Sequence, residues 1–227
     1  QLRPSVPHLQ ETRTTTLTKT DFFHREDTCT SSPYHLLYTG RMARQKGLLE
    51  MVEALAILVA QGRDVILDLV GWPEKNDDIL AELQTLAQVK GIPERVRYHG
   101  FKPVGPELFS YYQQADIYVL ASQSSFEGFP RTIWEAMAHN LPVVATKVGS
   151  IPEFIQGAAQ LIEPRNVSQL ADAIQLIIEN AQLRRTLIAK GSALAGKNTL
   201  EFQVAKMISS VNRWLRDHNH EQMGSSL

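Results

Sequence analysis

Residues 115–138 read ADIYVLASQSSFEGFPRTIWEAMA and combine the parts of a strand–loop–helix unit. The first part, Ile117–Ala121, is a short apolar and partly β-branched run, typical of a strand that is buried on both faces. A loop rich in Ser follows, and Pro130 suits the first turn of the helix after it. Short apolar runs that alternate with helical segments are the pattern of repeated βα units, so the sequence predicts a mostly parallel sheet.

The same alternation extends in both directions, from Tyr34 to about residue 180. Two segments have an apolar face of helical period, one from Leu48 to Val59 and one from Val167 to Ile178. Asn166 and Gln169 are spaced as a helix-capping pair before the second. We therefore predict an α/β fold, a Rossmann-like parallel sheet flanked by helices on both faces. The predicted strands are His35–Thr39, Val65–Val70, Val96–His99, Ile117–Ala121, Pro142–Thr146 and Ala159–Ile162.

The chain divides into three segments by pattern. Residues 1–33 are polar, rich in Thr and Ser and without helical period, which predicts a linker with at most one short strand. Residues 34–197 form the predicted Rossmann-like domain. Residues 198–227 form a last amphipathic helix and a tail. We expect the apolar stripe of this helix to pack on its own domain; the alternative is that it crosses to a domain outside the sequence. The stripe consists of Leu200, Val204, Met207, Ile208, Val211, Trp214 and Leu215.

Composition excludes several classes of protein. Of the 227 residues 43% are hydrophobic and 21% charged, which is typical of a globular domain and not of a disordered chain. The net charge of −1 gives no electrostatic reason to expect nucleic acid as a partner. Cys29 is the single cysteine, which fits a reducing compartment. The longest apolar run, Ala54–Ala60, is far shorter than the ~20 residues that span a bilayer. Because the sequence starts at Gln1 without a leader, we expect a fragment.

The loop after the first predicted strand is Gly40–Gly47, which reads GRMARQKG. Three cations, Arg41, Arg44 and Lys46, precede a helix whose free N-terminal amides favour negative charge. A diphosphate would satisfy the amides, the planar guanidinium and the compact ammonium together. The segment is neither a Walker loop nor the G-x-G-x-x-G dinucleotide motif. A solvated basic loop remains the alternative, and spacing alone does not separate the two.

Two glutamates frame the second informative loop, Glu127 at the mouth of a predicted helix and Glu135 just over one turn inside it. Helix side chains lean toward the N-terminus, so both carboxylates can face one crevice and accept hydroxyl hydrogen bonds. Gly128 would let the backbone approach a ligand. Spacing alone favours ordinary surface residues instead. A third loop, Gly149–Glu153, offers amides to a phosphate, although we expect Glu153 to cap a short helix.

Taken together, these motifs resemble the donor-binding C-terminal domain of retaining GT-B glycosyltransferases of family 4, the group 1 glycosyl transferases. The resemblance covers about Tyr34 to Asn180 and would make the predicted domain one half of a GT-B fold. The E-x7-E motif stands here as EGFPRTIWE, with Pro130-Arg131-Thr132 in place of the family's inner Gly-Leu-Pro. The other matching stretches are Gly40–Gly47, Ala115–Ser122, Pro142–Thr146 and Gly149–Glu153.

The resemblance implies a role for each matching residue. Arg41 and Lys46 would hold the donor diphosphate and stabilise charge on the leaving phosphate, and Glu127 would contact the transferred sugar; these three form the expected catalytic set. The expected donor-binding set is Gly40, Arg41, Lys46, Gly128, Phe129 and Glu135, with Glu135 on the ribose hydroxyls. No metal and no other cofactor is expected, because the histidines lack ligand spacing and the cations supply the charge. The loop His99–Pro103 either shapes the base pocket or places Phe101 in the core.

The implied activity is that of a retaining hexosyltransferase that moves a sugar from a nucleoside-diphosphate sugar to an acceptor hydroxyl. Its partners would be the nucleotide-sugar donor and a missing N-terminal acceptor domain, without which the fragment should be inactive. A peripheral membrane contact would come through that absent half, and the expected location is cytoplasmic. Asp21-Phe22-Phe23 is similar to the stretch that follows the interdomain linker in this family. The alternatives are a non-catalytic nucleotide-binding or interaction module and a GT-B-fold epimerase or phosphorylase.

Overall fold

The computed structural model describes residues 15–75, 77–125 and 127–224. Over these residues the chain forms a six-stranded, wholly parallel sheet in the order β3-β2-β1-β4-β5-β6. The predicted parallel sheet and its six strands are confirmed, with β1 and β2 running past their predicted ends. The strands are β1 (Tyr34–Met42), β2 (Val65–Pro73), β3 (Val96–Tyr98), β4 (Ile117–Leu120), β5 (Val143–Thr146) and β6 (Gln160–Ile162).

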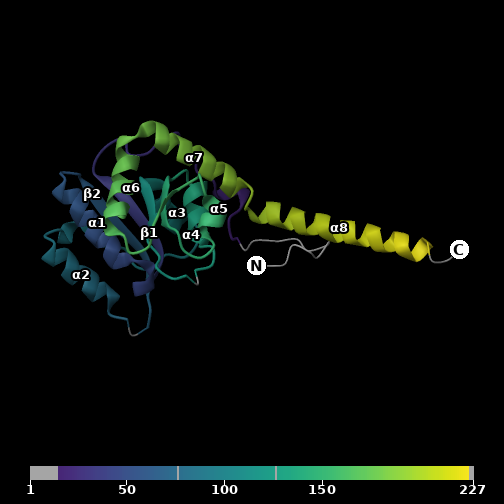
Figure 1. Ribbon diagram of the computed structural model, residues 1–227, viewed down its shortest axis with the longest axis horizontal. Helices are drawn as coiled ribbons and strands as arrows, with labels where there is room; N and C mark the ends of the chain where they lie inside the picture. The colour runs from purple at the N-terminus through teal and green to yellow at the C-terminus, as the bar shows by residue number, and fades with distance from the viewer. Residues whose placement is uncertain (1–14, 76, 126, 225–227) are drawn as a thin grey trace.

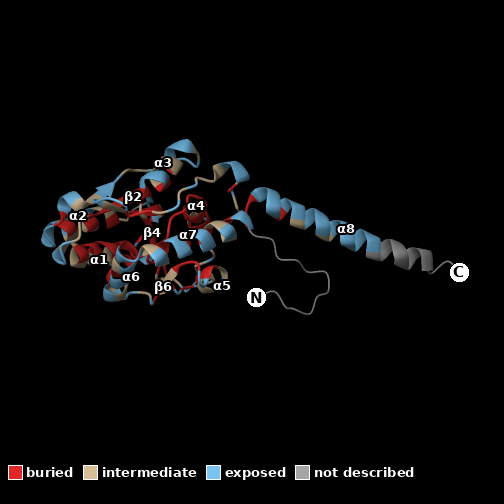
Figure 2. Ribbon diagram, turned by 90° about the horizontal axis from the view of Figure 1, so that it is seen from above, coloured by how far each residue is buried: buried red, intermediate tan, exposed pale blue. Residues whose placement is uncertain are grey.

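Helices cover both faces of the sheet, as predicted (Figures 1 and 2). Helices α1, α2 and α6 pack together on one face, whereas α3 and α4 lie on the other and α7 packs on α4. The α-helices are α1 (Leu48–Ala60), α2 (Ile79–Val89), α3 (Pro106–Gln114), α4 (Arg131–Ala138), α5 (Ile151–Ile155), α6 (Val167–Glu179), α7 (Ala181–Gly196) and α8 (Leu200–Gly224). Short 3₁₀ helices are η1 (Lys19–Asp21), η2 (Arg44–Lys46) and η3 (Pro93–Arg95).

The strand order reverses direction between β1 and β4, which are neighbours in the sheet. Connections from β1 lead outward through α1 to β2, and connections from β4 lead outward through α4 to β5. The loops that follow these two strands therefore diverge and leave a crevice at the carboxyl end of the sheet, where ligands of open α/β sheets bind. Both motif-bearing loops of the sequence lie there.

The predicted helix faces form the core. The apolar face of α1 is buried through Leu48, Val52 and Leu55, and α6 buries the face that its sequence period predicted. Asn166 caps α6 by accepting a hydrogen bond from the Gln169 amide at 2.9 Å. The Gln169 side chain accepts from the Glu163 amide instead of returning to Asn166, so only half of the predicted capping pair forms.

Residues 15–33 differ from the predicted linker because they pack on the domain. Leu17, Thr28 and Cys29 are buried. Asp27 pairs with the buried guanidinium of Arg184 in α7, with its two carboxylate oxygens at 2.6 and 3.1 Å. The Arg25 guanidinium donates to four carbonyl oxygens around the ends of α3 and α4. Single anchors of this kind leave no periodic pattern in a sequence, which explains the difference.

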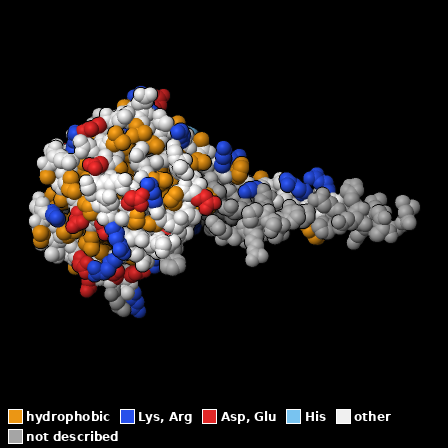
Figure 3. All heavy atoms as spheres, viewed as in Figure 1, with side chains coloured by type: hydrophobic (Ala, Val, Ile, Leu, Met, Phe, Trp, Pro, Cys, Tyr) orange, Lys and Arg blue, Asp and Glu red, His pale blue; other side chains and the backbone are white. Residues whose placement is uncertain are grey.

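Helix α8 differs from its prediction more strongly. It projects away from the domain as a long rod (Figure 1), and its apolar stripe does not pack on the domain as expected. Met207, Ile208 and Val211 are each more than half exposed. Apolar and basic side chains stand clear of the domain along the described part of the helix (Figure 3). Its attachment lies at its first turn, where the Leu200 amide donates to the Leu17 carbonyl at 2.7 Å. No helix within the described ranges is long and apolar enough to cross a bilayer.

Candidate active site

A cavity of about 340 Å³ opens at the carboxyl ends of β1, β2 and β4, beside the reversal point of the sheet. It brings five of the seven predicted site residues to one place. The predicted residues that line it are Gly40, Arg41, Lys46, Glu127 and Glu135. The cationic turn and the two glutamates therefore border a single cavity, although they come from separate loops.

Lys46 and Glu127 are in direct contact. The Lys46 Nζ atom lies 2.7 Å from Oε1 and 2.6 Å from Oε2 of Glu127. Both side chains are largely shielded, with exposed fractions of 16% and 13%. Glu127 also accepts a hydrogen bond from the Ser122 hydroxyl. A charged pair in such a semi-enclosed site can exchange its ammonium–carboxylate contact for contacts to a ligand that carries both negative charge and hydroxyl groups.

Close backbone contacts hold the two loops in place. Gly47 has φ +71°, and a Cβ atom there would lie 2.0 Å from the carbonyl oxygen of Ala121 at the end of β4. Gly149 has φ +53°, and a Cβ atom there would lie 1.8 Å from the carbonyl oxygen of Glu127. Only glycine fits these positions without rearrangement. The G-x-x-x-x-x-x-G spacing of the first loop and the Gly of the third thus serve backbone packing around Lys46 and Glu127.

Glu135 lies deeper in the cavity, in the second turn of α4, and is only 6% exposed. Its Oε2 atom accepts a hydrogen bond of 2.8 Å from the Tyr112 hydroxyl of α3. Burial raises the pKa of the Glu135 carboxyl, while the Tyr112 hydrogen bond and the charge of Arg131 act in the opposite direction. The site therefore contains two carboxylates in different environments, one paired with a cation and one held by a phenol.

The two arginines of the first loop point in different directions. Arg41 lines the cavity and its guanidinium pairs with Glu74, which follows β2. Arg44 instead pairs with Glu82 of α2. Of the three cations predicted around a ligand, Arg41 and Lys46 are thus at the cavity, whereas Arg44 serves the contact between η2 and α2.

Gly128 and Phe129 are not among the residues that line the cavity. The Phe129 ring stacks on Trp134 at a centroid distance of 4.3 Å and meets Phe154 edge-on at 5.3 Å. Its side chain therefore anchors the loop to α4 and α5, and donor binding by these two residues stays a prediction for their backbone. The expected cap by Glu153 does not form: Ser150 is the N-cap of α5, and Glu153 lies in the first turn.

Sequence reasoning missed Trp72 at the cavity and left open whether Phe101 shapes the base pocket or belongs to the core. Trp72 and Phe101 lie on its rim, 48% and 59% exposed, with ring centroids 5.4 Å apart at 81°. Phe101 is therefore not a core residue. Trp72 lies near the end of β2 and Phe101 follows β3, and an aromatic residue at or just after a strand end was the available signal. The Tyr112 contact had no signal, because a single hydrogen bond between two helices leaves no spacing pattern.

The described residues contain no group of three His, Cys, Asp or Glu side chains that could hold a metal ion. The cationic groups at the cavity are those of Arg41, Lys46, Lys102 and Arg131. The absence of a metal requirement stays a prediction.

The sequence profile of the family described as "Glycosyl transferases group 1" matches residues 20–193. The chain therefore belongs to this family. Amylovoran biosynthesis glycosyltransferase AmsK of Erwinia amylovora is 32% identical over 155 residues, which are 66% of this chain and 37% of AmsK. A D-inositol 3-phosphate glycosyltransferase of Arthrobacter sp. (strain FB24) is 26% identical over 82% of this chain and 45% of its own length. The chain thus spans less than half the length of these relatives.

Solved structures agree with the fold. The C-terminal domain of LpcC, a group 1 glycosyl transferase from Francisella tularensis, has a TM-score of 0.70 and 27% identity, and the match covers 81% of this chain and 99% of that domain. HepE from Anabaena, solved in complex with UDP-glucose, has a TM-score of 0.68 and 28% identity over 79% of this chain and 49% of its own. The chain has the Rossmann-like fold of GT-B glycosyltransferases.

Proposed function

We propose that this chain is the donor-binding half of a retaining glycosyltransferase that moves a hexosyl group from a nucleoside-diphosphate sugar to an acceptor hydroxyl. The observation that carries the proposal is the contact between Lys46 and Glu127 in the cavity that Glu135 also lines. A cation, a carboxylate and a second, deeper carboxylate match the three chemical parts of such a donor: diphosphate, sugar and ribose. Membership of the group 1 family and the likeness to HepE, which was solved with UDP-glucose, support it.

Each part of the donor has a proposed partner. Lys46 and Arg41 bind the diphosphate and stabilise the negative charge that develops on the leaving phosphate, without reorganisation and without a metal ion. Glu127, released from Lys46, accepts hydrogen bonds from the transferred sugar. Glu135 accepts from the ribose hydroxyls. The backbone of Gly40, Gly128 and Phe129 completes the site.

The rim offers a place for the nucleobase. Trp72 and Phe101 present apolar ring faces at the mouth of the cavity. Exposed aromatic rings that meet edge-on form a platform on which a planar base can stack, and this stacking tolerates different bases. We place the base between β2 and the segment after β3, so that the nucleotide runs from this rim past Glu135 to Lys46.

The acceptor side lies outside this chain. The relatives are more than twice as long as the segment they share with it, and a stripe of large apolar side chains is exposed on α8. We propose that an N-terminal domain of the whole protein covers this stripe and binds the acceptor. The fragment alone then binds donor but transfers no sugar. We keep the cytoplasm as the proposed location, with any peripheral membrane contact made through that domain.

Calorimetry with UDP and GDP tests the donor site. Lys46→Ala should lower the affinity for the nucleoside diphosphate that binds by about tenfold or more, because a charge-assisted contact to phosphate is lost. Arg41→Ala should lower it less, since this guanidinium is more exposed. Lys147→Ala is the matched control, a lysine that pairs with Glu163 on the surface. Unchanged binding in Lys46→Ala would overturn the proposed site.

A further inference from the structure

A hydroxyl relay lies behind the cavity and ends at Glu135. The Tyr112 hydroxyl donates to Glu135 Oε2 at 2.8 Å, and the Thr39 hydroxyl lies 2.5 Å from the same phenol oxygen. Tyr112 is fully buried. Because an ionised carboxylate only accepts, and a phenol has one proton, the direction of the relay follows: Thr39 donates to Tyr112, and Tyr112 donates to Glu135. The relay connects α4 through α3 to β1, one residue before Gly40.

The two carboxylate oxygens of Glu135 have different surroundings. Oε2 is held by the phenol, and none of the described residues donates a hydrogen bond to Oε1. Glu135 is a cavity-lining residue, so Oε1 is the atom that a ligand can reach. Burial raises the pKa of the carboxyl, and the Tyr112 hydrogen bond acts against this rise. Without the phenol, both the rotamer of Glu135 and its charge would be less well defined.

We propose that Tyr112 is a positioning residue that fixes Glu135 so that Oε1 faces the ribose hydroxyls of the nucleotide, and that the chain distinguishes ribonucleotides from deoxyribonucleotides through this contact. The inference rests on the proposed function for the assignment of Glu135 to the ribose. The new part is that Tyr112 orients the Glu135 carboxylate and that this orientation selects for the ribose hydroxyls of the nucleotide. Tyr112 touches no substrate atom itself.

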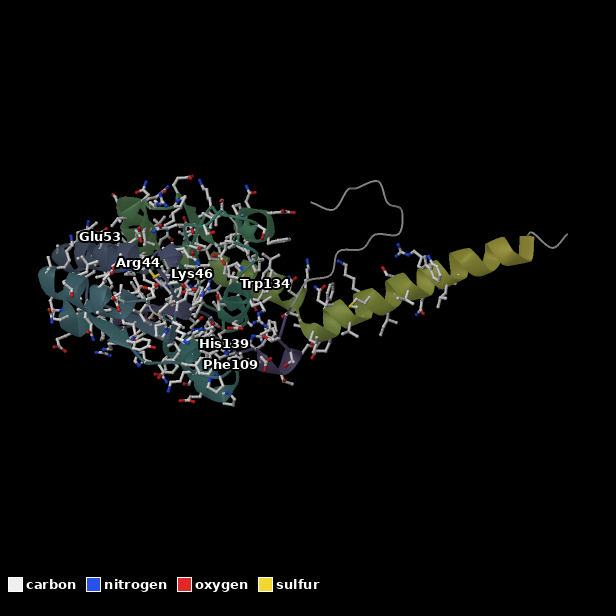
Figure 4. The ribbon with its side chains drawn as sticks, turned by 90° about the horizontal axis from the view of Figure 1, so that it is seen from below. Arg44, Lys46, Glu53, Phe109, Trp134 and His139 are labelled. Atoms are coloured by element: carbon white, nitrogen blue, oxygen red, sulfur yellow. The ribbon has the colours of Figure 1, made fainter. Side chains whose placement is uncertain are left out.

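Substitution by phenylalanine isolates the hydroxyl from the ring. The Tyr112 ring stacks on Tyr118 at 6.0 Å and on His139 at 5.2 Å, and His139 lies beside Phe109 (Figure 4). Tyr112→Phe keeps this packing. Tyr118→Phe is the matched control, because Tyr118 is equally buried and donates to Thr132 at 2.6 Å and not to Glu135. Its hydroxyl meets the relay only through long contacts of 3.5 and 3.4 Å to the hydroxyl and carbonyl oxygens of Thr39.

The first measurement is calorimetry of the 227-residue chain with UDP, GDP and ADP and with their 2′-deoxy counterparts. The wild-type chain should prefer the ribonucleotide to the deoxyribonucleotide by about tenfold, the value of one charge-assisted hydrogen bond. In Tyr112→Phe this ratio should fall toward one, and in Tyr118→Phe it should stay at the wild-type value. A wild-type ratio in Tyr112→Phe overturns the proposal, as does the absence of any ribose preference in the wild type.

The second measurement does not need a nucleotide. The Glu135 carboxyl is followed by carbon NMR as a function of pH, with its signal assigned by its loss in Glu135→Gln. Its titration midpoint should move upward in Tyr112→Phe and stay in place in Tyr118→Phe. Equal midpoints in wild type and Tyr112→Phe overturn the positioning role. If the wild type binds none of the three diphosphates, the proposed function fails while this titration still decides whether Tyr112 controls Glu135.

Discussion

The ammonium of Lys46 lies within 2.7 Å of both carboxylate oxygens of Glu127, 81 positions further along the chain. The two residues belong to different βα units, on either side of the point where the strand order reverses. In the absence of a ligand each neutralises the other in a partly closed site. Under the proposed function, a nucleotide sugar has to break this ion pair before Lys46 can bind the diphosphate and Glu127 can bind the sugar.

Glu127→Gln should therefore have opposite effects on binding and stability. Removing the carboxylate frees the ammonium and removes repulsion toward the diphosphate, so affinity for UDP or GDP should rise by about fivefold. Stability should fall by about 1 kcal/mol, or roughly 2–4 °C in Tm, because a shielded ion pair is lost. Calorimetry and thermal unfolding measure the two effects. Glu163→Gln, which loses an exposed pair with Lys147, should change neither. Weaker binding of the diphosphate in Glu127→Gln would contradict the idea that Glu127 and the diphosphate compete for the Lys46 ammonium.

Gly149→Ala tests the backbone contact beneath Glu127. The new Cβ would lie 1.8 Å from the Glu127 carbonyl oxygen, at φ +53°, so both strain and collision should destabilise the fold and displace Glu127. Gly62→Ala is the control, with φ +81° and open space around the added atom within the described residues. We expect about 1 kcal/mol of destabilisation for Gly62→Ala and at least twice that for Gly149→Ala. Chemical unfolding measures both, and equal effects would show that the collision is relieved.

The order and type of the helices and strands could be predicted from the sequence, because both depend on a hydrophobic periodicity that recurs along each segment. The apolar face from Leu48 and the capping spacing at Asn166 are examples. The position of Lys46 and Glu127 at the same edge of the sheet follows from one general property of parallel sheets, namely that the loops after neighbouring strands meet there. The parallel fold was predicted from the alternation of apolar runs with helical segments, whereas membership of the family was predicted from the resemblance of the motifs.

Other features of the structure could not be predicted, because they depend on single contacts or on the surface against which a segment packs. Arg25 and Asp27 anchor a segment that has no period of its own. Tyr112 reaches Glu135 through one hydrogen bond between two helices. The apolar stripe of α8 has the same pattern whether it packs on its own domain or on another, so its sequence predicts a buried face without naming the surface that buries it.

A carboxylate between two histidines makes stability depend on pH. Asp68 Oδ2 lies 2.7 Å from His35 Nδ1, and Oδ1 lies 2.7 Å from His99 Nε2. The hydrogen bond to Asp68 raises the pKa of His35. Burial acts to raise the pKa of Asp68, but the hydrogen bonds from both histidines outweigh it and the net pKa is lowered. The cluster joins β1, β2 and the segment after β3.

The direction in which stability changes with pH follows from the raised pKa of His35 and the lowered pKa of Asp68. A raised histidine pKa stabilises the fold fully below about pH 6.5 and loses this effect as the pH rises through the folded-state value. A lowered aspartate pKa stabilises it above about pH 4 and loses the effect in acid. The free energy of unfolding should thus be greatest between these limits, and Asp68→Asn should flatten the profile. Asp172→Asn, at an exposed site on α6, should leave it unchanged. Parallel profiles for wild type and Asp68→Asn would refute this.

Cys29 should report on the attachment of residues 15–33. Burial raises the pKa of its thiol to about 12, so at pH 8 it is protonated and shielded, and Ellman's reagent should modify it slowly. Asp27→Ala removes the pairing with Arg184 and Arg185 and should speed modification by about tenfold through local opening. Asp64→Ala, which loses a more exposed pair with Arg95, serves as control. An unchanged rate in Asp27→Ala would mean that other contacts hold the segment.

The stripe on α8 should be dispensable for the fold of this chain. Met207, Ile208 and Val211 are more than half exposed, so replacing all three by Ser removes little buried area and should change Tm by less than about 2 °C. The same change should reduce concentration-dependent self-association, measured by light scattering, because exposed apolar stripes associate. Replacing Lys206 and Arg213 by Ser is the control, since it leaves the stripe intact. A fall in Tm of several degrees in the triple variant would instead mean that the stripe packs on this domain in solution, and the proposed surface for an N-terminal domain would be lost.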